Sequence, residues 1–508
     1  MAAERGGSYK WYALGLLAFL NVLNYLDRNV IFGLFEPIKR DLGITDSQLG
    51  WLGAAYVLLF SVAAFPFGLL SDLRSRRAVV AAGVAIWSTF TALGGLVKSF
   101  TQLFVMRAAV GVGSAAFGPA SNSLVADYFP GQRRALAFGI LMAGVPVGGA
   151  LGFWLGGQLE VMYGWRVAFF AVGVPGLFLA ALAARLVDPC RTPEPVTLKR
   201  VLARFEVGAS ALLRQFAPLL VAGLIGTVAA YYVDRRYGAS SAADAAVLGT
   251  AVGIGLAVNI GWWLWRIRKD RIADTPFGPQ VTGPVGDVLE ELHRAFRVVL
   301  RTPTLFYVFL AGAMISFGLN GLVGWGPTFA SRALGWDSST ATRELGVLAV
   351  VAGSLGTLVG GVVADWLRPR TDSSRILATA IGMLIGGPIA FYTLTVRDPV
   401  LFVRLFAVAF FFLTWYNGPL SAMIFDVVPN RISASVVGAY MMFIHLAGDA
   451  VALPLVGILS DRIGIDRAIL VLPTVSIAGG LVVLMATRSV RRDMERATLP
   501  TAEFQAVI

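Results

Sequence analysis

The chain has 508 residues, of which 57% are hydrophobic and 14% are charged, and its formal net charge at pH 7 is +12. An ordinary soluble domain carries about 25% charged residues, so this composition excludes a soluble globular protein. The long apolar stretches lack the alternation of barrel strands, which leaves transmembrane helices as the expected element. The one cysteine, Cys190, excludes an intrachain disulfide and argues against a thiolate metal site.

The first half of the chain predicts six membrane spans. A bilayer core about 30 Å thick needs roughly 20 apolar residues in a helix. The opening segment, MAAERGGSYK, lacks the architecture of a cleaved signal, so we expect the first span to be retained. The N-terminal six-helix half is residues 1–186, with spans near 11–37, 47–70, 78–98, 102–129, 135–157 and 164–186.

A central linker, 187–303, follows and is expected on the cytoplasmic side. It begins with a polar, basic segment and then contains two apolar stretches, 217–233 and 245–265, which predict two extra spans. A twelve-span protein with a re-entrant hairpin is the alternative, because the first stretch has only 17 residues. Helical spacing of apolar residues in 286–301 predicts an amphipathic helix on the membrane face or under the bundle.

A second set of six spans forms the C-terminal half, 304–487, and a cytoplasmic tail, 488–508, completes the chain. These spans lie near 304–327, 343–366, 374–395, 400–428, 432–458 and 467–487. We therefore expect an all-helical polytopic membrane protein of two six-helix halves with two extra central helices, about fourteen spans in total.

Basic residues collect in the loops on one side of the predicted bundle and in the tail. The positive-inside rule makes that side cytoplasmic, with both termini there, in a plasma or bacterial inner membrane. This placement explains the net charge, so we expect no nucleic-acid partner. The residues concerned are Arg74, Arg76, Arg77, Arg133, Arg134, Arg368, Arg370, Arg375, Arg488, Arg491, Arg492 and Arg496.

The two halves repeat a pattern. FGLLSDLRSRR (67–77) after the second span corresponds to GGVVADWLRPR (360–370) in the second half: small residues, an acid, then arginines. Repeated halves related by an axis along the membrane normal are typical of secondary transporters, which bind substrate between them. The loop residues lie outside the hydrocarbon, so we interpret them as a cytoplasmic gate: Asp72, Arg76, Arg77, Asp365 and Arg368.

The polar residues of the first span include Asn21, Asn24, Asp27 and Arg28. A charge inside a span costs between about 2.5 and 17 kcal/mol, so it usually faces the bundle interior. Asp27 can gain and lose a proton as solvent access alternates, whereas an arginine stays protonated. A fixed ion pair that braces the helix is the alternative for Asp27. The asparagines are expected either to line a substrate cavity or to join helices by hydrogen bonds.

Further candidates lie on other spans. Arg107 is expected to face a substrate anion or a carboxylate, with snorkelling to the interface as the alternative. His445 and Asp449, four residues apart on one helix face, are either a proton relay or a tie between helices. Ser114, His445 and Asp449 are also expected in the substrate cavity, and weaker candidates for lining it are Asn320, Asn417 and Asp426.

No glycine-rich segment follows a strand or precedes a Lys-Ser/Thr pair, so the sequence contains no phosphate loop. It also shows no catalytic triad and no metal-ligand cluster. We expect neither an enzyme nor a bound cofactor or metal, and the energy for concentrative transport would come from an ion gradient.

Three short motifs resemble the major facilitator superfamily. GLLSDLRSRR (68–77) is similar to its loop signature, with Leu73 where an arginine usually stands; RAAVGVG (107–113) and AGVPVGG (143–149) are similar to its fourth-helix and fifth-helix patterns. Their order on successive helices makes the resemblance specific, and it covers the chain apart from 187–303.

Within that superfamily the sequence most resembles the spinster-like transporters, which export sphingolipids and lysophospholipids in animals. The similar segments are NYLDR (24–28), GLVGWGPTFASRALG (321–335) and HLAGDAVALPLVGILSDR (445–462). The resemblance implies that Asp27 is the proton-coupling carboxylate and Arg28 its partner. It departs at Ser114, where the family usually has a glutamate, so a second titrating carboxylate is missing from the fourth helix.

We therefore expect a secondary active transporter of the major facilitator superfamily, coupled to protons, that moves a small organic or lipid-like substrate by alternating access. Its expected partners are that substrate, protons and membrane lipids. An organic-anion symporter of the same superfamily, which shares N-Y-x-D-R, is one alternative, with Arg28 and Arg107 as a carboxylate clamp. A passive lipid scramblase or a non-transporting sensor is another.

Overall fold

Every regular element that the computed structural model describes is a helix, which confirms the expected all-helical fold. Ten stretches of this part of the chain are long and apolar enough to cross a membrane. The predicted spans 217–233 and 245–265 and most of 286–301 lie outside the described residues, so the total of fourteen spans stays a prediction. The described residues are 8–73, 75–129, 133–188, 221, 258, 295 and 297–499.

Each of the six spans predicted in the first half coincides with helical structure. The first continues through a 3₁₀ turn, η1, into a short amphipathic helix, α2, which ends at Gly43 with a positive φ of 62°. Only glycine adopts this conformation readily, so the chain turns back there. The elements are α1 (Ser8–Val30), η1 (Ile31–Leu34), α2 (Phe35–Leu42), α3 (Asp46–Leu73), α4 (Arg76–Gly94), α5 (Phe100–Tyr128), α6 (Arg134–Tyr163) and α7 (Trp165–Ala183).

The second half has the same plan, but three of its predicted spans are interrupted. A turn at 469–470 divides the span expected at 467–487. A turn at 414–416 divides the span expected at 400–428, and a π-helical turn, η3, divides the span expected at 432–458. The elements are α11 (Pro303–Ala333), α12 (Ser338–Leu367), α13 (Ser374–Thr393), α14 (Pro399–Leu413), α15 (Asn417–Val427), α16 (Asn430–Ile444), η3 (His445–Asp449), α17 (Ala450–Ile463), α18 (Ile465–Ala468), α19 (Val471–Met485), η4 (Ala486–Arg488) and α20 (Val490–Ala497).

Helices within each half pack closely because small residues line their contacts. In the first half α1 packs along α6, and α5 packs between α3 and α4. A Cβ atom on Gly148 of α6 would lie 2.2 Å from the Val22 carbonyl oxygen of α1, so only glycine allows this approach. In the second half α11 packs along α19, and α13 contacts both α14 and α19.

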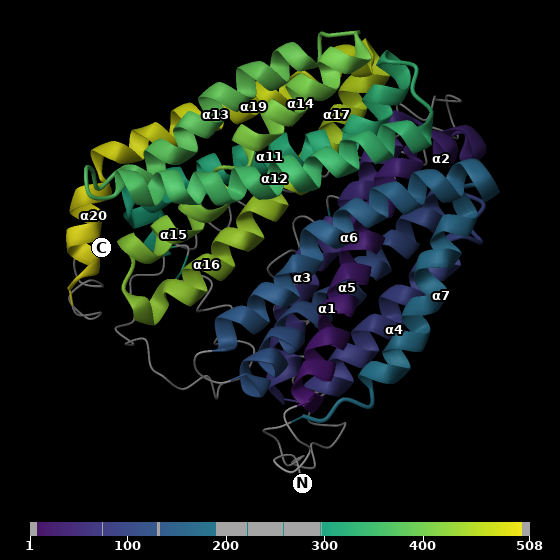
Figure 1. Cartoon of the computed structure of the whole chain (residues 1–508), viewed down its shortest axis with the longest axis horizontal. Helices are drawn as coiled ribbons and strands as arrows, with labels where there is room; N and C mark the ends of the chain where they lie inside the picture. The colour runs from purple at the N-terminus through teal and green to yellow at the C-terminus, as the bar shows by residue number, and fades with distance from the viewer. Residues whose placement is uncertain are drawn as a thin grey trace.

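The two halves meet mainly where α3 contacts α17 and α6 contacts α12. Figure 1 shows the purple-blue and green-yellow halves converging near α2 and α17 and spreading apart toward the N-terminus and α20. A Cβ on Gly50 of α3 would lie 2.3 Å from the Leu453 carbonyl oxygen of α17, so the backbones touch at the converging end. We call this the closed end of the molecule.

Candidate functional site: buried charges between the two halves

Asp27 lies in the first span with its side chain almost fully buried. Arg107 of α5 forms an ion pair with it, with 3.3 Å between Nη1 and Oδ1, and the same nitrogen donates to the Asp27 carbonyl oxygen. Thr91 of α4 donates its hydroxyl to the second carboxylate oxygen. Two neighbouring helices of the same half therefore hold the Asp27 carboxylate.

The expected pairing of Asp27 with Arg28 is wrong. Consecutive residues of a helix do not face each other, because each residue turns about 100° around the axis. Arg28 instead points to the other half of the molecule, where its Nη2 lies 3.7 Å from Oδ2 of Asp449. The two neighbours in NYLDR thus pair with different helices.

Asp449 is the acceptor of a polar cluster in the second half. His445 lies 2.7 Å away through Nδ1, and Asn320 of α11 donates from Nδ2 to Oδ1 at 2.9 Å. Ser316 donates its hydroxyl to the same oxygen. His445 and Asp449 occupy η3, and π-helical turns occur frequently at functional sites because they redirect side chains.

Tyr56 of α3 joins the two arginines, and the sequence offered no signal for it beyond an aromatic residue in an apolar span. Its ring centre lies 5.6 Å from the Arg28 guanidinium carbon and 5.5 Å from that of Arg107. An aromatic face attracts a cation through its quadrupole, more strongly where water is excluded. Tyr56 is 2% exposed, so it helps to hold both guanidiniums.

The cluster balances two arginines against two carboxylates when His445 is neutral. A buried ion pair tolerates the loss of one partner poorly, because the remaining charge is then uncompensated. Arginine does not release its proton in proteins. Any proton that the cluster takes up must therefore go to Asp27, Asp449 or His445.

The other residues predicted to line a cavity differ in their surroundings. Asn21 donates to the Leu141 carbonyl oxygen of α6 at 2.8 Å, which joins two helices. Asn24 is buried, and its Nδ2 has no hydrogen-bond partner within the described part of the chain. Ser114 is buried beside Tyr56, so it lies close to the charged cluster although it lacks a titrating group.

Asn417 and Asp426, both on α15, have partners outside this cluster. Asn417 is exposed and donates to Oγ1 of Thr357 at 3.2 Å. Asp426 forms ion pairs with Arg368, at 3.5 Å, and with Arg375. These contacts stay within the second half of the molecule.

The predicted gate residues near the chain termini also contact only their own half, among the partners that the structure describes. Arg76 pairs with Asp127, and Arg77 donates to the Leu186 carbonyl oxygen at 3.1 Å. Asp365 accepts a backbone hydrogen bond from Arg368 at the end of α12. The side chain of Asp72 lies outside the described residues.

Two helical halves with balanced charges buried at their interface define a membrane protein of the secondary-transporter class. The chain belongs to the Major Facilitator Superfamily, whose family model matches residues 17–234 and 216–449. The superfamily expected from the three motifs is thereby confirmed.

Individual proteins extend this likeness over nearly the whole chain. An MFS-type efflux pump of Mycolicibacterium smegmatis is 26% identical over 504 residues, 97% of this chain and 96% of its own. The sphingosine-1-phosphate transporter SPNS2 of Xenopus tropicalis is 23% identical over 527 residues, 96% of this chain and 85% of its own.

A solved structure shares the fold. The crystal structure of a bacterial homologue of the human lysosomal transporter spinster, in an inward-facing and unoccupied conformation, matches with a TM-score of 0.71 at 19% identity, over 96% of this chain and 99% of its own. The expected resemblance to spinster proteins is confirmed by these matches.

Proposed function

We propose that this protein is a secondary active transporter that couples substrate movement to protons through the buried cluster around Asp27 and Asp449. The observation that carries the proposal is that two carboxylates lie buried on opposite halves, each facing an arginine. The halves must move relative to each other in alternating access, so the Arg28–Asp449 contact changes when they do. The protonation state of the cluster can thereby bias the exchange between conformations.

In our proposal, Asp449 takes the role of the second carboxylate, which the fourth helix lacks at Ser114. The fourth helix lacks an acid there, but Asp449 and His445 place titratable groups beside Arg28 from the opposite half. In the mechanism we propose, loss of the Arg28 contact leaves Asp449 with a buried charge, and a proton on Asp449 or His445 compensates it. Asp27 then need not carry the coupling alone.

We further propose a lipid-like substrate with a polar head group. The support is the similarity to a relative named as a sphingosine-1-phosphate transporter. An organic-anion symporter is less well supported by the geometry, because both guanidiniums already face a carboxylate. An anion could bind them only after Asp27 or Asp449 is neutralised. We also propose that the protein lies in a plasma or bacterial inner membrane with its terminal end in the cytoplasm, and the basic loops support this orientation.

Transport in proteoliposomes tests the proposal. Lysolipids, sphingoid lipids and small organic acids would each be assayed with and without a pH gradient, for the wild type and for Asp27→Asn. We expect one lipid class to move faster when the gradient is imposed and Asp27→Asn to lose that acceleration. The exposed Glu344→Gln is the matched control for a lost carboxylate.

The proposal fails if Asp27→Asn and wild type respond equally to the gradient. Equilibration of lipid at the same rate with and without a gradient would indicate a passive scramblase. Binding of a lipid with no flux would indicate a sensor.

A further inference from the structure

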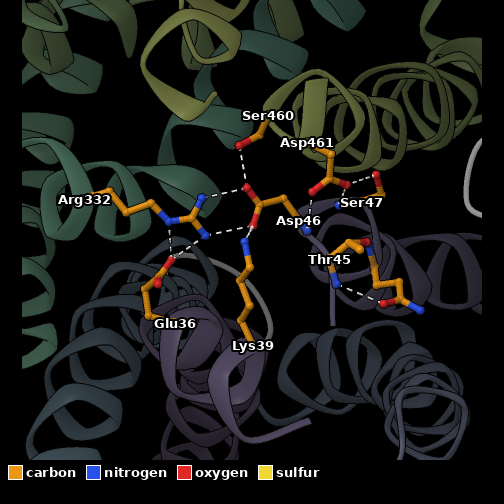
Figure 2. A network of polar contacts seen from close by, with 9 residues as sticks. Glu36, Lys39, Thr45, Asp46, Ser47, Arg332, Ser460 and Asp461 are labelled. Atoms are coloured by element: carbon orange, nitrogen blue, oxygen red, sulfur yellow. Dashed lines mark hydrogen bonds and ion pairs between the residues drawn. The ribbon is translucent and has the colours of Figure 1, made fainter. Parts of the chain in front are cut away.

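A second charged network lies at the closed end of the molecule and contains residues from both halves. Figure 2 shows Asp46 at its centre, between Arg332 of the second half and Lys39 of the first, with Ser460 and Asp461 of α17 above it. None of these residues belongs to the buried cluster around Asp27. The network was not apparent from the sequence, because its members come from four different helices.

Arg332 joins the two halves through three hydrogen bonds in this network. Its Nη1 and Nη2 donate to the two carboxylate oxygens of Asp46 at 2.6 and 2.8 Å, and its Nε donates to Glu36 at 2.7 Å. Such paired bonds between a guanidinium and a carboxylate are stronger than single neutral ones. One arginine of α11 therefore binds α2 and α3 of the opposite half together.

Lys39 and Ser460 complete the surroundings of Asp46. The Lys39 ammonium lies 2.6 Å from Oδ1, and the Ser460 hydroxyl donates to Oδ2 at 2.5 Å. Burial by itself raises the pKa of the Asp46 carboxyl, but hydrogen bonds from Arg332, Lys39 and Ser460 outweigh it and hold that pKa well below its usual range. Asp46 therefore carries its charge throughout the physiological pH range.

Asp461 supplies a second link, to the N-terminus of α3. Its carboxylate accepts hydrogen bonds from the Asp46 and Ser47 backbone N–H groups at 2.9 and 2.8 Å, and from the Ser47 hydroxyl. The first N–H groups of a helix have no partner within it, and a negative charge there is stabilised by the helix dipole. The opposite half thus caps α3, in addition to the local capping box of Thr45 and Gln48.

We propose that Arg332, Asp46 and Asp461 form a latch that keeps the closed end shut and must break whenever the halves separate there. Every contact from Arg332 and Asp461 in this network crosses from one half to the other, so separation removes them all at once. The described gate residues at the terminal end make no such crossing contacts, which fits a state latched at one end only. The latch works without substrate and without protons, so it does not depend on the proposed coupling.

Accessibility of a buried cysteine tests the latch. Thr342 of α12 is fully buried and packs against Gly33 and Gly157 of the first half. Thr342→Cys would be introduced with Cys190→Ser, and its reaction with a polar maleimide would be timed in lipid nanodiscs without substrate. We expect Arg332→Gln to raise the labelling rate about tenfold, which corresponds to about 1.4 kcal/mol. Asp461→Asn should give a smaller increase.

Two controls separate the latch from general effects. Arg343→Gln removes an exposed arginine on the same helix as the reporter and should leave the rate unchanged. Ser476→Cys places the reporter against Gly318 inside the second half, where separation of the halves does not expose it. High salt should accelerate labelling of Thr342→Cys in the parent but not in Arg332→Gln, because salt screens these partly exposed pairs.

Parent-like labelling in both Arg332→Gln and Asp461→Asn would overturn the latch. Equal acceleration by Arg343→Gln, or equal acceleration at Thr342→Cys and Ser476→Cys, would overturn it too. Acceleration by Arg343→Gln would indicate a general charge effect. Equal acceleration at both reporters would indicate that the whole bundle is loosened.

Discussion

Arg28 and Asp449 lie on opposite halves of the molecule, with 3.7 Å between Nη2 and Oδ2. Asp27, the neighbour of Arg28 in the chain, pairs instead with Arg107 in its own half. Asp27 and Arg28, although consecutive in the chain, therefore contact different halves of the molecule. Asp27 is paired within one half, whereas Arg28 contacts a group of the other half.

Removal of Arg107 should destabilise the protein strongly. Arg107→Gln leaves the Asp27 carboxylate buried without its main partner, so the free energy of unfolding should fall by about 3–5 kcal/mol. The double variant Asp27→Asn, Arg107→Gln should recover part of this loss, since it removes the unpaired charge. Thermal unfolding in detergent at pH 7 measures both.

Arg166→Gln, which breaks an exposed pair with Asp41, is the control and should lower the free energy of unfolding by at most about 1 kcal/mol. If Arg107→Gln and Arg166→Gln lower the free energy of unfolding equally, burial does not decide the cost of losing an arginine.

The pH dependence of transport should report on His445. A neutral imidazole can accept a proton, and protonated His445 can pair with Asp449 in place of Arg28. We expect His445→Gln to keep the fold and the transport of substrate but to flatten the pH dependence of transport. Initial rates at a series of symmetric pH values measure the profile. A profile identical to that of the wild type would exclude His445 from proton transfer.

Substitution of Gly50 should open the closed end. A methyl group there meets the Leu453 carbonyl oxygen, and overpacking of this kind costs about 1–3 kcal/mol. Gly50→Ala should therefore accelerate maleimide labelling of Thr342→Cys. Gly139→Ala on α6 is the matched control, because a methyl group at Gly139 meets no atom of the described residues within 4 Å. If Gly50→Ala and Gly139→Ala give the same labelling rate, the close packing of α3 on α17 does not keep this end closed.

Loss of the Asp337 cap should weaken the start of α12 in a pH-dependent way. Asp337 accepts from the Thr340 backbone N–H at 3.2 Å, and hydrogen bonds from Thr340 lower the pKa of its carboxyl. Because the folded pKa lies below the ordinary value of about 3.9, the cap contributes fully above that value. Its contribution is lost as the pH falls through the folded pKa.

Asp337→Ala should therefore lower the free energy of unfolding by about 1 kcal/mol at pH 7, and by less as the pH falls below about 3.9. Thermal unfolding at pH 7 and pH 3 checks this. Asp337→Ser, which keeps a side-chain acceptor, should recover most of the loss at both pH values. A pH-independent difference between Asp337→Ala and the wild type would contradict the assigned cap.

Hydropathy alone was enough to predict the long helices that the structure describes, because the cost of exposing backbone and charge to lipid acts on each stretch independently of the others. The same local cost singled out Asp27, Arg28 and Arg107 as buried charges. It also placed His445 and Asp449 on one helix face, since their spacing in a helix is a matter of local geometry.

Which charges meet was decided only by the packing of helices. The sequence contains no information by itself on the partners of Asp27 and Arg28, because neighbours in a helix point in different directions and each side chain meets whatever helix lies opposite. The link of Arg332 to Asp46, and the capping of α3 by Asp461, likewise arise where four distant segments converge. Composition and spacing determine that such charged groups are buried in a helical bundle. The tertiary structure determines which partners they pair with.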